Sequence, residues 1–197
     1  MSTDEPRPPW LRTSLQELSR LDRALYVTVA QAETPTLDAG LRNLSLLADK
    51  SKLWLGVAAV LAVAGGPRGR RAAVSGVASI GLASASVNLG VKPLARRARP
   101  IRDADAFDAR HVRMPVSTSF PSGHSASAFA FAEGVSAVLP WLGFPLRLMA
   151  TAVADSRVHC GVHYPGDVVA GSLIGMTSGR FAARLTRRVW PPPVRPS

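Results

Sequence analysis

Residues 72–91 read AAVSGVASIGLASASVNLGV and carry no charged side chain, although Arg71 and Lys92 flank them. A helix needs about 20 predominantly apolar residues to cross the hydrocarbon core of a bilayer, and this run reaches that length without its flanks. Its alanine, glycine and serine residues are the small residues that let membrane helices pack closely. The stretch therefore predicts a membrane-spanning helix, and with it an all-α fold.

Four other runs in the chain are largely apolar. They are residues 53–66, 125–146, 148–154 and 168–179. Glu133 interrupts the second run and the others are short, so these spans would depend on flanking Lys and Arg side chains that reach the membrane surface. We expect an integral-membrane helical bundle of about five short spans. Gly171, Gly175 and Gly179 recur every four residues in the last run, which predicts a small face against a neighbouring helix.

Two segments before the first apolar run have the pattern of amphipathic helices. Leu18 and Leu25 belong to a series of apolar residues at helical spacing within residues 15–32, and charged residues interrupt that segment. A second helix is expected over residues 37–49, after Pro35. Both would lie at the membrane interface or beside the bundle rather than cross the bilayer.

The chain is expected to have three parts. Residues 1–52 would hold a Pro-rich, charged tail over residues 1–12 and the amphipathic helices, residues 53–189 the membrane-embedded domain, and residues 190–197 a Pro-rich tail. The first residues lack the basic and apolar regions of a cleavable signal peptide. Insertion would therefore use an internal segment, and we expect a multi-pass protein of the cell (inner) membrane.

The charge balance argues for lipid and phosphate partners. The chain has 24 Lys and Arg against 13 Asp and Glu, a net charge of +11. It shows no zinc-finger spacing and no RNA-recognition signature, so nucleic acid is not expected as a partner. Affinity for membrane lipids and phosphate explains the charge better. The single cysteine, Cys160, excludes an internal disulfide and is expected to be a small buried residue.

Three short strings, each beside an apolar run, carry residues suited to chemistry on phosphate. Residues 92–100 are KPLARRARP, residues 121–124 are PSGH and residues 156–167 are SRVHCGVHYPGD. They supply fixed cations, the start of a helix with a histidine, and a second histidine with a carboxylate four residues later. Because phosphoryl transfer is catalysed mostly by positioning and positive charge, we expect these strings to meet in one phosphoryl-transfer site.

Several of these residues suit phosphate binding. Arginine offers a planar fork to two phosphate oxygens, whereas lysine acts as a compact point charge. The backbone N–H groups of Ser122 and Gly123 would face the anion at the N-terminus of a helix that begins near Pro121. Ser156 is expected to position a neighbouring ligand or oxygen. The expected phosphate-binding residues are Lys92, Arg99, Ser122, Gly123, Ser156 and Arg157.

The two histidines of the strings would divide the catalytic work. His163 would attack phosphorus as a neutral imidazole, while Asp167 accepts the other ring N–H and fixes the tautomer. His124, when protonated, would donate to the departing oxygen and then activate water. This scheme needs neither a metal nor a cofactor. His159 and His163 could bind a metal from one helix, but no third ligand is evident, so no metal site is expected.

These strings resemble the three signature motifs of the type-2 phosphatidic acid phosphatase (PAP2) family, which is related to vanadium haloperoxidases. The match covers residues 92–167 with every defining position in order. The resemblance implies an all-helical fold, a phosphohistidine intermediate on His163, an acid/base role for His124, and hydrolysis of a lipid phosphomonoester or diphosphate. The compact length and amphipathic N-terminal segment are similar to small actinobacterial members, some of which dephosphorylate decaprenylphosphoryl phosphoribose on the route to cell-wall arabinan.

Two other functions use the same features. A vanadate-dependent peroxidase could hold vanadate with the residues that hold phosphate, although the expected membrane spans argue against it. A non-catalytic lipid-binding or scaffold protein would explain the charged loop and the glycine face, but not a histidine and a carboxylate at fixed spacing beside Arg157. Oligomeric state is not indicated, because the glycine face could pack within the chain or between chains.

The remaining charges lead to expectations of their own. Glu133, inside an apolar run, is expected to pair with an arginine or a polar helix neighbour. The positive-inside rule places the expected turn at residues 67–71, Arg147 and the C-terminal end in the cytoplasm and the site outside, although the arginines of the catalytic loop count against this orientation. The other loop arginines are expected to flank the membrane or contact headgroups. They are Arg96, Arg97, Arg102, Arg110 and Arg113.

Overall fold

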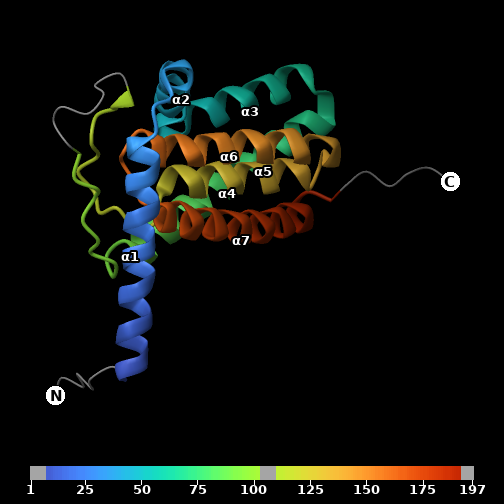
Figure 1. The fold of residues 1–197 in the computed structure, drawn as a ribbon. Coiled ribbons are helices and arrows are strands. Elements are labelled where there is room, and N and C mark those ends of the chain that lie inside the picture. Colours follow the sequence, from blue (N-terminus) through green and yellow to red (C-terminus); the bar gives the residue numbers. More distant parts are fainter. Residues whose placement is uncertain (1–7, 103–109, 192–197) are drawn as a thin grey trace.

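The computed structural model describes residues 8–102 and 110–191, and these residues form helices and loops only. The all-α class predicted from the sequence is therefore confirmed for them (Figure 1). The α-helices are α1 (Pro9–Gln31), α2 (Pro35–Leu47), α3 (Lys52–Ala64), α4 (Gly66–Ala85), α5 (Gly123–Ser136), α6 (Gly143–His159) and α7 (Pro165–Val189). A π-helical segment, Ser86–Val91, continues α4, and short 3-10 turns occupy Asp49–Ser51 and Pro140–Leu142.

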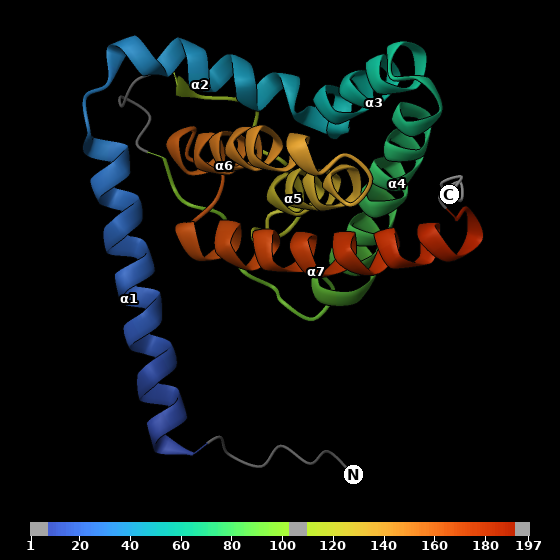
Figure 2. The ribbon, with the colours of Figure 1, turned by 90° about the vertical axis from the view of Figure 1, so that its right-hand side faces the viewer.

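Helices α3 to α7 form a bundle with α5 at its centre. α5 packs against α4, α6 and α7, and α3 packs against α4. Helix α1 runs perpendicular to α7 across one end of this bundle, as the two views show (Figures 1 and 2). The two amphipathic segments predicted from the sequence are thus helices, and α1 lies across the bundle end rather than alongside the other helices.

The glycine face of α7 lies directly on α5. A Cβ atom added at Gly171 or at Gly175 would lie 2.3 Å from a backbone oxygen of α5 or its cap. A Cβ at Gly179 would lie 2.7 Å from the carbonyl oxygen of Ala130. The predicted small face is therefore confirmed, and it packs within the chain. This contact fixes the starts of α5 and α7 side by side, where two of the three strings lie.

The expected span over residues 125–146 is wrong, because the structure divides it. α5 ends at Ser136, a turn follows, and α6 begins at Gly143. Pro140 explains the break, since proline cannot donate a helical N–H and its ring clashes with the preceding turn. The short run 148–154 lies inside α6 and is no separate element.

The starts of two helices also differ from the expected boundaries. Residues 67–71 were expected to form a connecting turn between helices, but they form the first part of α4. Proline is tolerated in the first turn of a helix, where Pro67 lies. α1 begins at Pro9, so the expected tail does not extend to residue 12. Residues 1–7 and 192–197 of the expected tails and residues 103–109 of the expected loop lie outside the described residues.

Glu133 confirms the expectation that it pairs with arginine. Its carboxylate is buried on α5, with Oε1 2.7 Å from Nε of Arg147 and Oε2 3.0 Å from Nε of Arg180. The pairing joins α5 to α6 and α7 toward the bundle end that is remote from the three strings.

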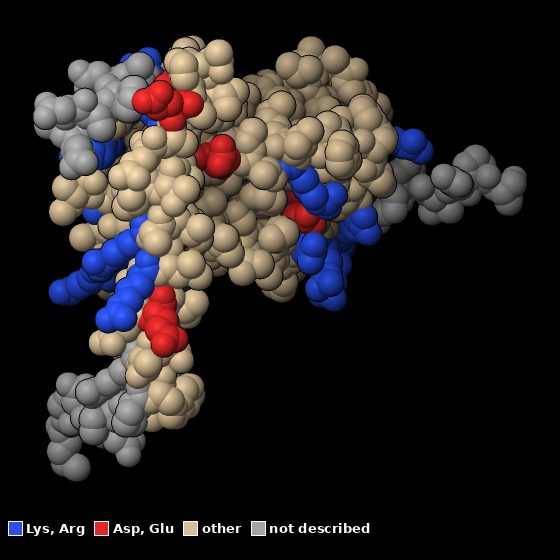
Figure 3. Space-filling view, in the orientation of Figure 1, with Lys and Arg blue, Asp and Glu red and all other residues tan. Residues whose placement is uncertain are grey.

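The outer surface of the bundle suits a lipid environment. By length and composition, one helix of the described residues could cross a membrane by itself, Gly66–Val91, with a mean hydropathy of 1.5. Five short spans therefore stay a prediction. Large apolar side chains face outward on several helices, including Val60, Val63, Val74, Leu148, Leu173 and Phe181. Figure 3 shows Lys and Arg gathered toward the two ends of the bundle, with mostly uncharged surface between them.

Candidate active site

The three strings meet at the end of the bundle that α1 crosses. The loop after α4, the start of α5 and the segment joining α6 to α7 surround a cavity of about 260 Å³. Of the expected site residues, those that line it are Lys92, Arg99, Gly123, His124 and His163. The other four are buried, with Ser122 on the start of α5, Ser156 and Arg157 on α6, and Asp167 on α7.

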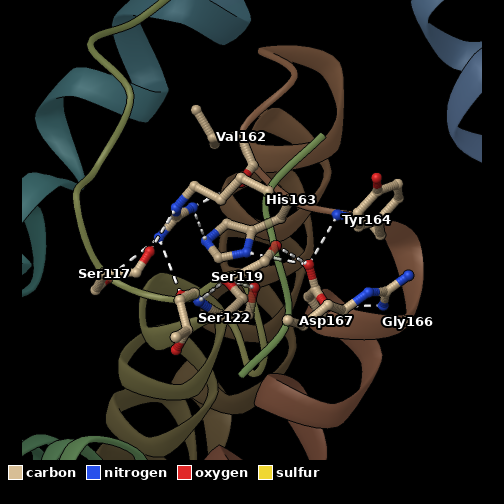
Figure 4. Close-up of polar contacts among 12 residues, drawn as sticks. Ser117, Ser119, Ser122, Val162, His163, Tyr164, Gly166 and Asp167 are labelled. Carbon is tan, nitrogen blue, oxygen red and sulfur yellow. Dashed lines mark hydrogen bonds and ion pairs between the residues drawn. The ribbon is translucent and has the colours of Figure 1, made fainter. Parts of the chain in front are cut away.

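His163 is held between a carboxylate and a guanidinium. Its side chain is 2% exposed, with Nδ1 3.5 Å from Oδ2 of Asp167 and Nε2 3.2 Å from Nη1 of Arg99 (Figure 4). Burial, with a contribution from the Arg99 charge and against the opposing effect of Asp167, lowers the pKa of His163 to about 4. The imidazole is therefore neutral near pH 7. With Nδ1 directed at the carboxylate, Nε2 is the nitrogen available to attack.

Asp167 is anchored by hydrogen bonds from other parts of the site. The Ser119 hydroxyl and the Tyr164 backbone N–H both donate to Oδ2, the latter at 2.9 Å. Nη1 of Arg97 donates to Oδ1 at 2.9 Å. The carboxylate is fully buried in the first turn of α7. These contacts fix its orientation, and through it the tautomer and the plane of the His163 ring.

Arg97 is a site residue that the sequence pattern misassigned. Rather than flank the membrane, its guanidinium contacts Asp167, and its Nη2 lies 2.6 Å from Oδ2 of Asp22 on α1. It covers the Tyr164 ring at 4.1 Å from the ring centroid. The other oxygen of Asp22 accepts the Gly166 N–H at 2.7 Å. Nothing in the local spacing connects Asp22 with Arg97, because the contact joins distant parts of the chain.

Two cations of the first string are held by the loop that follows and by the segment between α6 and α7. Arg99 donates to the carbonyl oxygens of Val162 at 2.6 Å and Ser117 at 2.9 Å, and more weakly to Thr118 at 3.3 Å. Nζ of Lys92 donates to the Ser117 hydroxyl at 3.2 Å. Burial lowers the pKa of each of these basic groups from its ordinary value. The site therefore presents preorganised positive charge.

Arg157 supports the third string from behind the cavity. Its side chain is 3% exposed, its Nη1 donates to the Ser45 hydroxyl, and its Nε has no hydrogen-bond partner. Its carbonyl oxygen accepts the N–H groups of Val162 and His163 at 3.1 and 3.2 Å. A buried guanidinium with an unpaired N–H beside this cavity fits an anionic ligand.

Two expected phosphate contacts are not present in the form predicted. The Ser122 N–H already donates to the carbonyl oxygen of Asp167 at 2.9 Å, so it is not free at the helix start. Its hydroxyl instead caps α5 by accepting the Ser125 N–H at 3.4 Å. The Ser156 hydroxyl donates to the Val153 carbonyl oxygen at 2.7 Å. Both serines therefore act on backbone that positions the site, and Gly123 is the residue of that turn that lines the cavity.

His124 lines the cavity from the start of α5. Its Nε2 is buried without a hydrogen-bond partner and lies 3.5 Å from Oδ1 of Asp49. Asp49 lines the same cavity. A ring nitrogen that faces a cavity with no partner of its own is suited to exchange a proton with a bound group.

Two further arginines of the loop are also structural. Arg102 donates to the carbonyl oxygens of Val112 at 2.9 Å and Gly161 at 3.1 Å. Nε of Arg110 lies 2.9 Å from Oδ1 of Asp38, and that oxygen is also 2.9 Å from Nε2 of His159. The expectation that these arginines contact headgroups is therefore wrong, because the protein interior engages them. His159 is directed at a carboxylate of α2 rather than at the His163 site.

The sequence of the chain fits a known family. Residues 72–191, more than half of the chain, fit the model of the PAP2 superfamily. The chain belongs to the PAP2 superfamily. It is 35% identical over 159 residues to the decaprenylphosphoryl-5-phosphoribose phosphatase of Mycobacterium tuberculosis (strain ATCC 25618 / H37Rv). The matched region covers 79% of this chain and 85% of that protein. It is 33% identical over 121 residues to the lipid A 4'-phosphatase of Bacteroides thetaiotaomicron, covering 56% and 54%.

Solved PAP2 structures share the fold. LpxE of Aquifex aeolicus superposes with a TM-score of 0.64 at 25% identity, covering 83% of this chain and 95% of that one. The transmembrane phosphatidylglycerolphosphate phosphatase of Bacillus subtilis also gives a TM-score of 0.64, at 21% identity and 89% coverage of each chain. With its family and its relatives, the chain is a phosphoric ester hydrolase of the PAP2 type.

Proposed function

We propose that this PAP2 protein is a metal-independent lipid phosphatase that hydrolyses a phosphomonoester or diphosphate of a membrane lipid through a phosphohistidine on His163. The observation that supports this proposal best is the placement of His163, with Nδ1 toward the buried Asp167 and Nε2 toward Arg99 at the cavity. A neutral, oriented imidazole beside fixed cations is what attack on a phosphate ester requires.

In the first step, Nε2 of His163 forms a bond to phosphorus while the bond from phosphorus to the ester oxygen breaks. Asp167 accepts the N–H of Nδ1 and stabilises the positive charge that develops on the ring. Lys92, Arg99 and Arg157 balance the charge on the non-bridging oxygens. His124, in its protonated form, gives its proton to the departing oxygen, so the leaving group departs as an alcohol or as a protonated phosphate.

In the second step, His124 acts as a base. It takes a proton from a water molecule, whose oxygen bonds to phosphorus as the bond between phosphorus and Nε2 of His163 breaks. Inorganic phosphate is released, and both histidines return to their starting protonation states. His124 and water account for every proton transferred in the cycle. No step of the scheme uses a metal.

For the lipid, we propose a polyprenyl-linked phosphate, with a phospholipid phosphate as the second candidate. The named activity of the mycobacterial relative, which covers most of this chain, supports the first. The lipid A phosphatase of Bacteroides thetaiotaomicron supports the broader class of lipid phosphates. The residues of the three strings would contact only the phosphate group, so they do not select between these lipids.

Phosphate release by the purified protein in detergent tests this proposal. The substrates are phosphatidic acid, phosphatidylglycerol phosphate, a polyprenyl phosphate, a polyprenyl diphosphate and a prenyl phosphoribose phosphate, each with EDTA present. We expect turnover that survives EDTA and falls by about 10³-fold or more in His163→Ala. His111→Ala, a loop histidine away from this cavity, is the matched control.

The outcomes separate the alternatives. Release that is unaffected by the loss of His163 would exclude it as nucleophile. Absence of release from every lipid would favour a non-catalytic lipid-binding protein. Oxidation of halide by peroxide in the presence of vanadate, together with no phosphate release from any lipid, would instead favour the vanadate-dependent peroxidase.

A further inference from the structure

A carboxylate outside the three strings reaches into the catalytic cavity. Asp49, in the turn between α2 and α3, is the one acidic residue among the described residues that line the cavity. Its Oδ1 lies 3.5 Å from the unpartnered Nε2 of His124, and its side chain is 49% exposed. A negative charge is unexpected beside a phosphate site, because it opposes the binding of an anion. The presence of the Asp49 carboxylate at this cavity therefore needs an explanation.

The backbone around this carboxylate adopts an unusual conformation. Lys50 and Ser51, the next two residues, have positive φ angles of 51° and 59°. Such angles are uncommon for residues other than glycine and cost free energy unless the surrounding structure holds them. Both residues also line the cavity. The turn therefore keeps Asp49 at the cavity rim in spite of a conformational cost.

The position of Asp49 relative to the two histidines defines what it would meet. In a phosphoryl transfer, the attacking atom and the departing oxygen lie on opposite sides of phosphorus. His163 supplies the attacking nitrogen and His124 protonates the departing oxygen. The group attached to that oxygen therefore lies beside Nε2 of His124, and so beside Asp49.

Besides its cations, among them Lys50 next to Asp49, the cavity has neutral polar side chains. Ser51, Ser84, Asn88 and Ser127 line the cavity together with Asp49. Hydroxyl and amide groups can exchange hydrogen bonds with the hydroxyls of a sugar, and a carboxylate accepts strong hydrogen bonds from them. A departing phosphate, in contrast, would bring negative charge next to Asp49.

We propose that Asp49 selects the leaving group, by accepting hydrogen bonds from the hydroxyls of a sugar-bearing alcohol and by repelling a leaving phosphate. The substrate class is then the phosphomonoester of a sugar-bearing lipid rather than a lipid diphosphate. This inference rests on the proposed function, because it assigns the two sides of the phosphorus through His163 and His124. It concerns a residue outside the signature strings, whose charge acts on the leaving group.

The test compares two substrates with the same prenyl chain, a prenyl phosphoribose phosphate and a prenyl diphosphate. The ratio of their kcat/KM values is measured for the wild type, for Asp49→Asn and for Asp155→Asn. We expect the wild type to favour the sugar phosphate and Asp49→Asn to lower the ratio by about tenfold or more, partly through faster diphosphate hydrolysis. Asp155, exposed on α6 and outside the cavity lining, is the matched control for loss of one negative charge.

The ratio is measured at several pH values, because an alcohol needs a proton from His124 to depart whereas a phosphate can depart as an anion. A change of ratio in Asp49→Asn that disappears as the pH is lowered would show that Asp49 acts through the proton affinity of His124, and it would overturn the proposal. An unchanged ratio in Asp49→Asn, an equal change in Asp155→Asn, or a wild type that favours the diphosphate would each overturn the proposal. Release from phosphatidic acid or phosphatidylglycerol phosphate but from neither prenyl lipid would overturn this inference alone, whereas no release from any of the lipids would overturn the proposed function as well.

Discussion

Arg97 connects the first helix of the chain to the carboxylate that orients His163. Its guanidinium lies between Asp22 on α1 and Asp167 on α7, and it does not line the cavity. We expect Arg97→Gln to lower kcat by about 10- to 100-fold with a smaller change in KM, because orientation of the nucleophile is lost while the phosphate-binding cations remain. Steady-state kinetics with a lipid phosphate measure both constants.

Arg96 provides the matched control for this substitution. It is the adjacent arginine of the same string and its side chain is exposed. Arg96→Gln removes the same charge and should leave kcat and KM within about twofold of the wild type, as expected for surface changes. Equal kinetics for the two variants, or an effect of Arg97→Gln confined to KM, would contradict the positioning role.

The protonation of His163 links the site to stability. Its pKa is about 4 in the folded protein against an ordinary value of 6.5, so between these pH values the unfolded chain binds a proton that the folded protein does not. Stability therefore falls as pH drops from 6.5 to 4, by about 3 kcal/mol for this group alone. His163→Gln lacks this loss. We expect its melting temperature in detergent to improve relative to the wild type as pH falls from 7.5 to 4.5.

A constant difference in melting temperature between the two proteins across that range would show that His163 titrates alike in the folded and unfolded states. In that case the imidazole would be half-protonated near pH 6.5, and its role as a neutral nucleophile would need another cause than burial.

At this scale, the sequence predicted the residues that gather around the cavity better than the residues that orient them. His163 and Asp167 stand four apart across the start of a helix, so their proximity follows from local geometry. Ser119 and Arg97 reach Asp167 from a loop, and Asp22 reaches Arg97 from another helix. Such contacts depend on how distant segments pack, and no periodicity in one sequence encodes them.

Between elements, α5 and α7 are in close contact along the glycine face of α7. Because a Cβ at Gly175 would lie 2.3 Å from the Ala126 carbonyl oxygen, Gly175→Ala must push the two helices apart. Overpacking of this kind costs about 1–3 kcal/mol. We expect a lower melting temperature in detergent and a lower specific activity, since α5 carries His124 and α7 carries Asp167.

Gly56 on α3 serves as the control, because nothing lies within 4 Å of a Cβ built there. Gly56→Ala should leave stability unchanged or slightly higher, since alanine favours the helical conformation over glycine by about 1 kcal/mol. If Gly175→Ala were as stable and as active as Gly56→Ala, the helices would not be in the contact that the glycine spacing predicts.

The elements themselves show where sequence patterns are informative. Apolar runs and glycine spacing predicted the helices of the bundle and one of their packing faces. The patterns failed at Pro140, where an apolar run continued through a helix break, and at residues 67–71, where a charged proline-containing sequence begins a helix. Hydropathy records where a segment is apolar, whereas helix ends depend on backbone hydrogen bonding and on proline.

For the whole molecule, the distribution of exposed arginines bears on its orientation in a membrane. At the site end, Arg97, Arg99, Arg102 and Arg110 donate to groups of the protein itself. At the opposite end, arginines of α4 and α7 are exposed: Arg68, Arg70, Arg180, Arg184, Arg187 and Arg188. Because Arg70, Arg180 and Arg187 also donate to groups of the protein, such contacts do not distinguish the two ends. The exposed arginines of α4 and α7 are the charge that the positive-inside rule places in the cytoplasm, with the site outside.

This orientation predicts which exposed positions a membrane-impermeant maleimide can reach in intact cells. Leu94, 86% exposed in the loop after α4, lies at the site end, and Trp141, 71% exposed between α5 and α6, lies at the opposite end. We expect Leu94→Cys to be labelled in intact cells and Trp141→Cys only after permeabilisation. The native Cys160 is buried, so the unsubstituted protein gives the background. The reverse pattern would place the catalytic cavity in the cytoplasm, and labelling of both positions in intact cells would mean that the bundle does not separate them across the membrane.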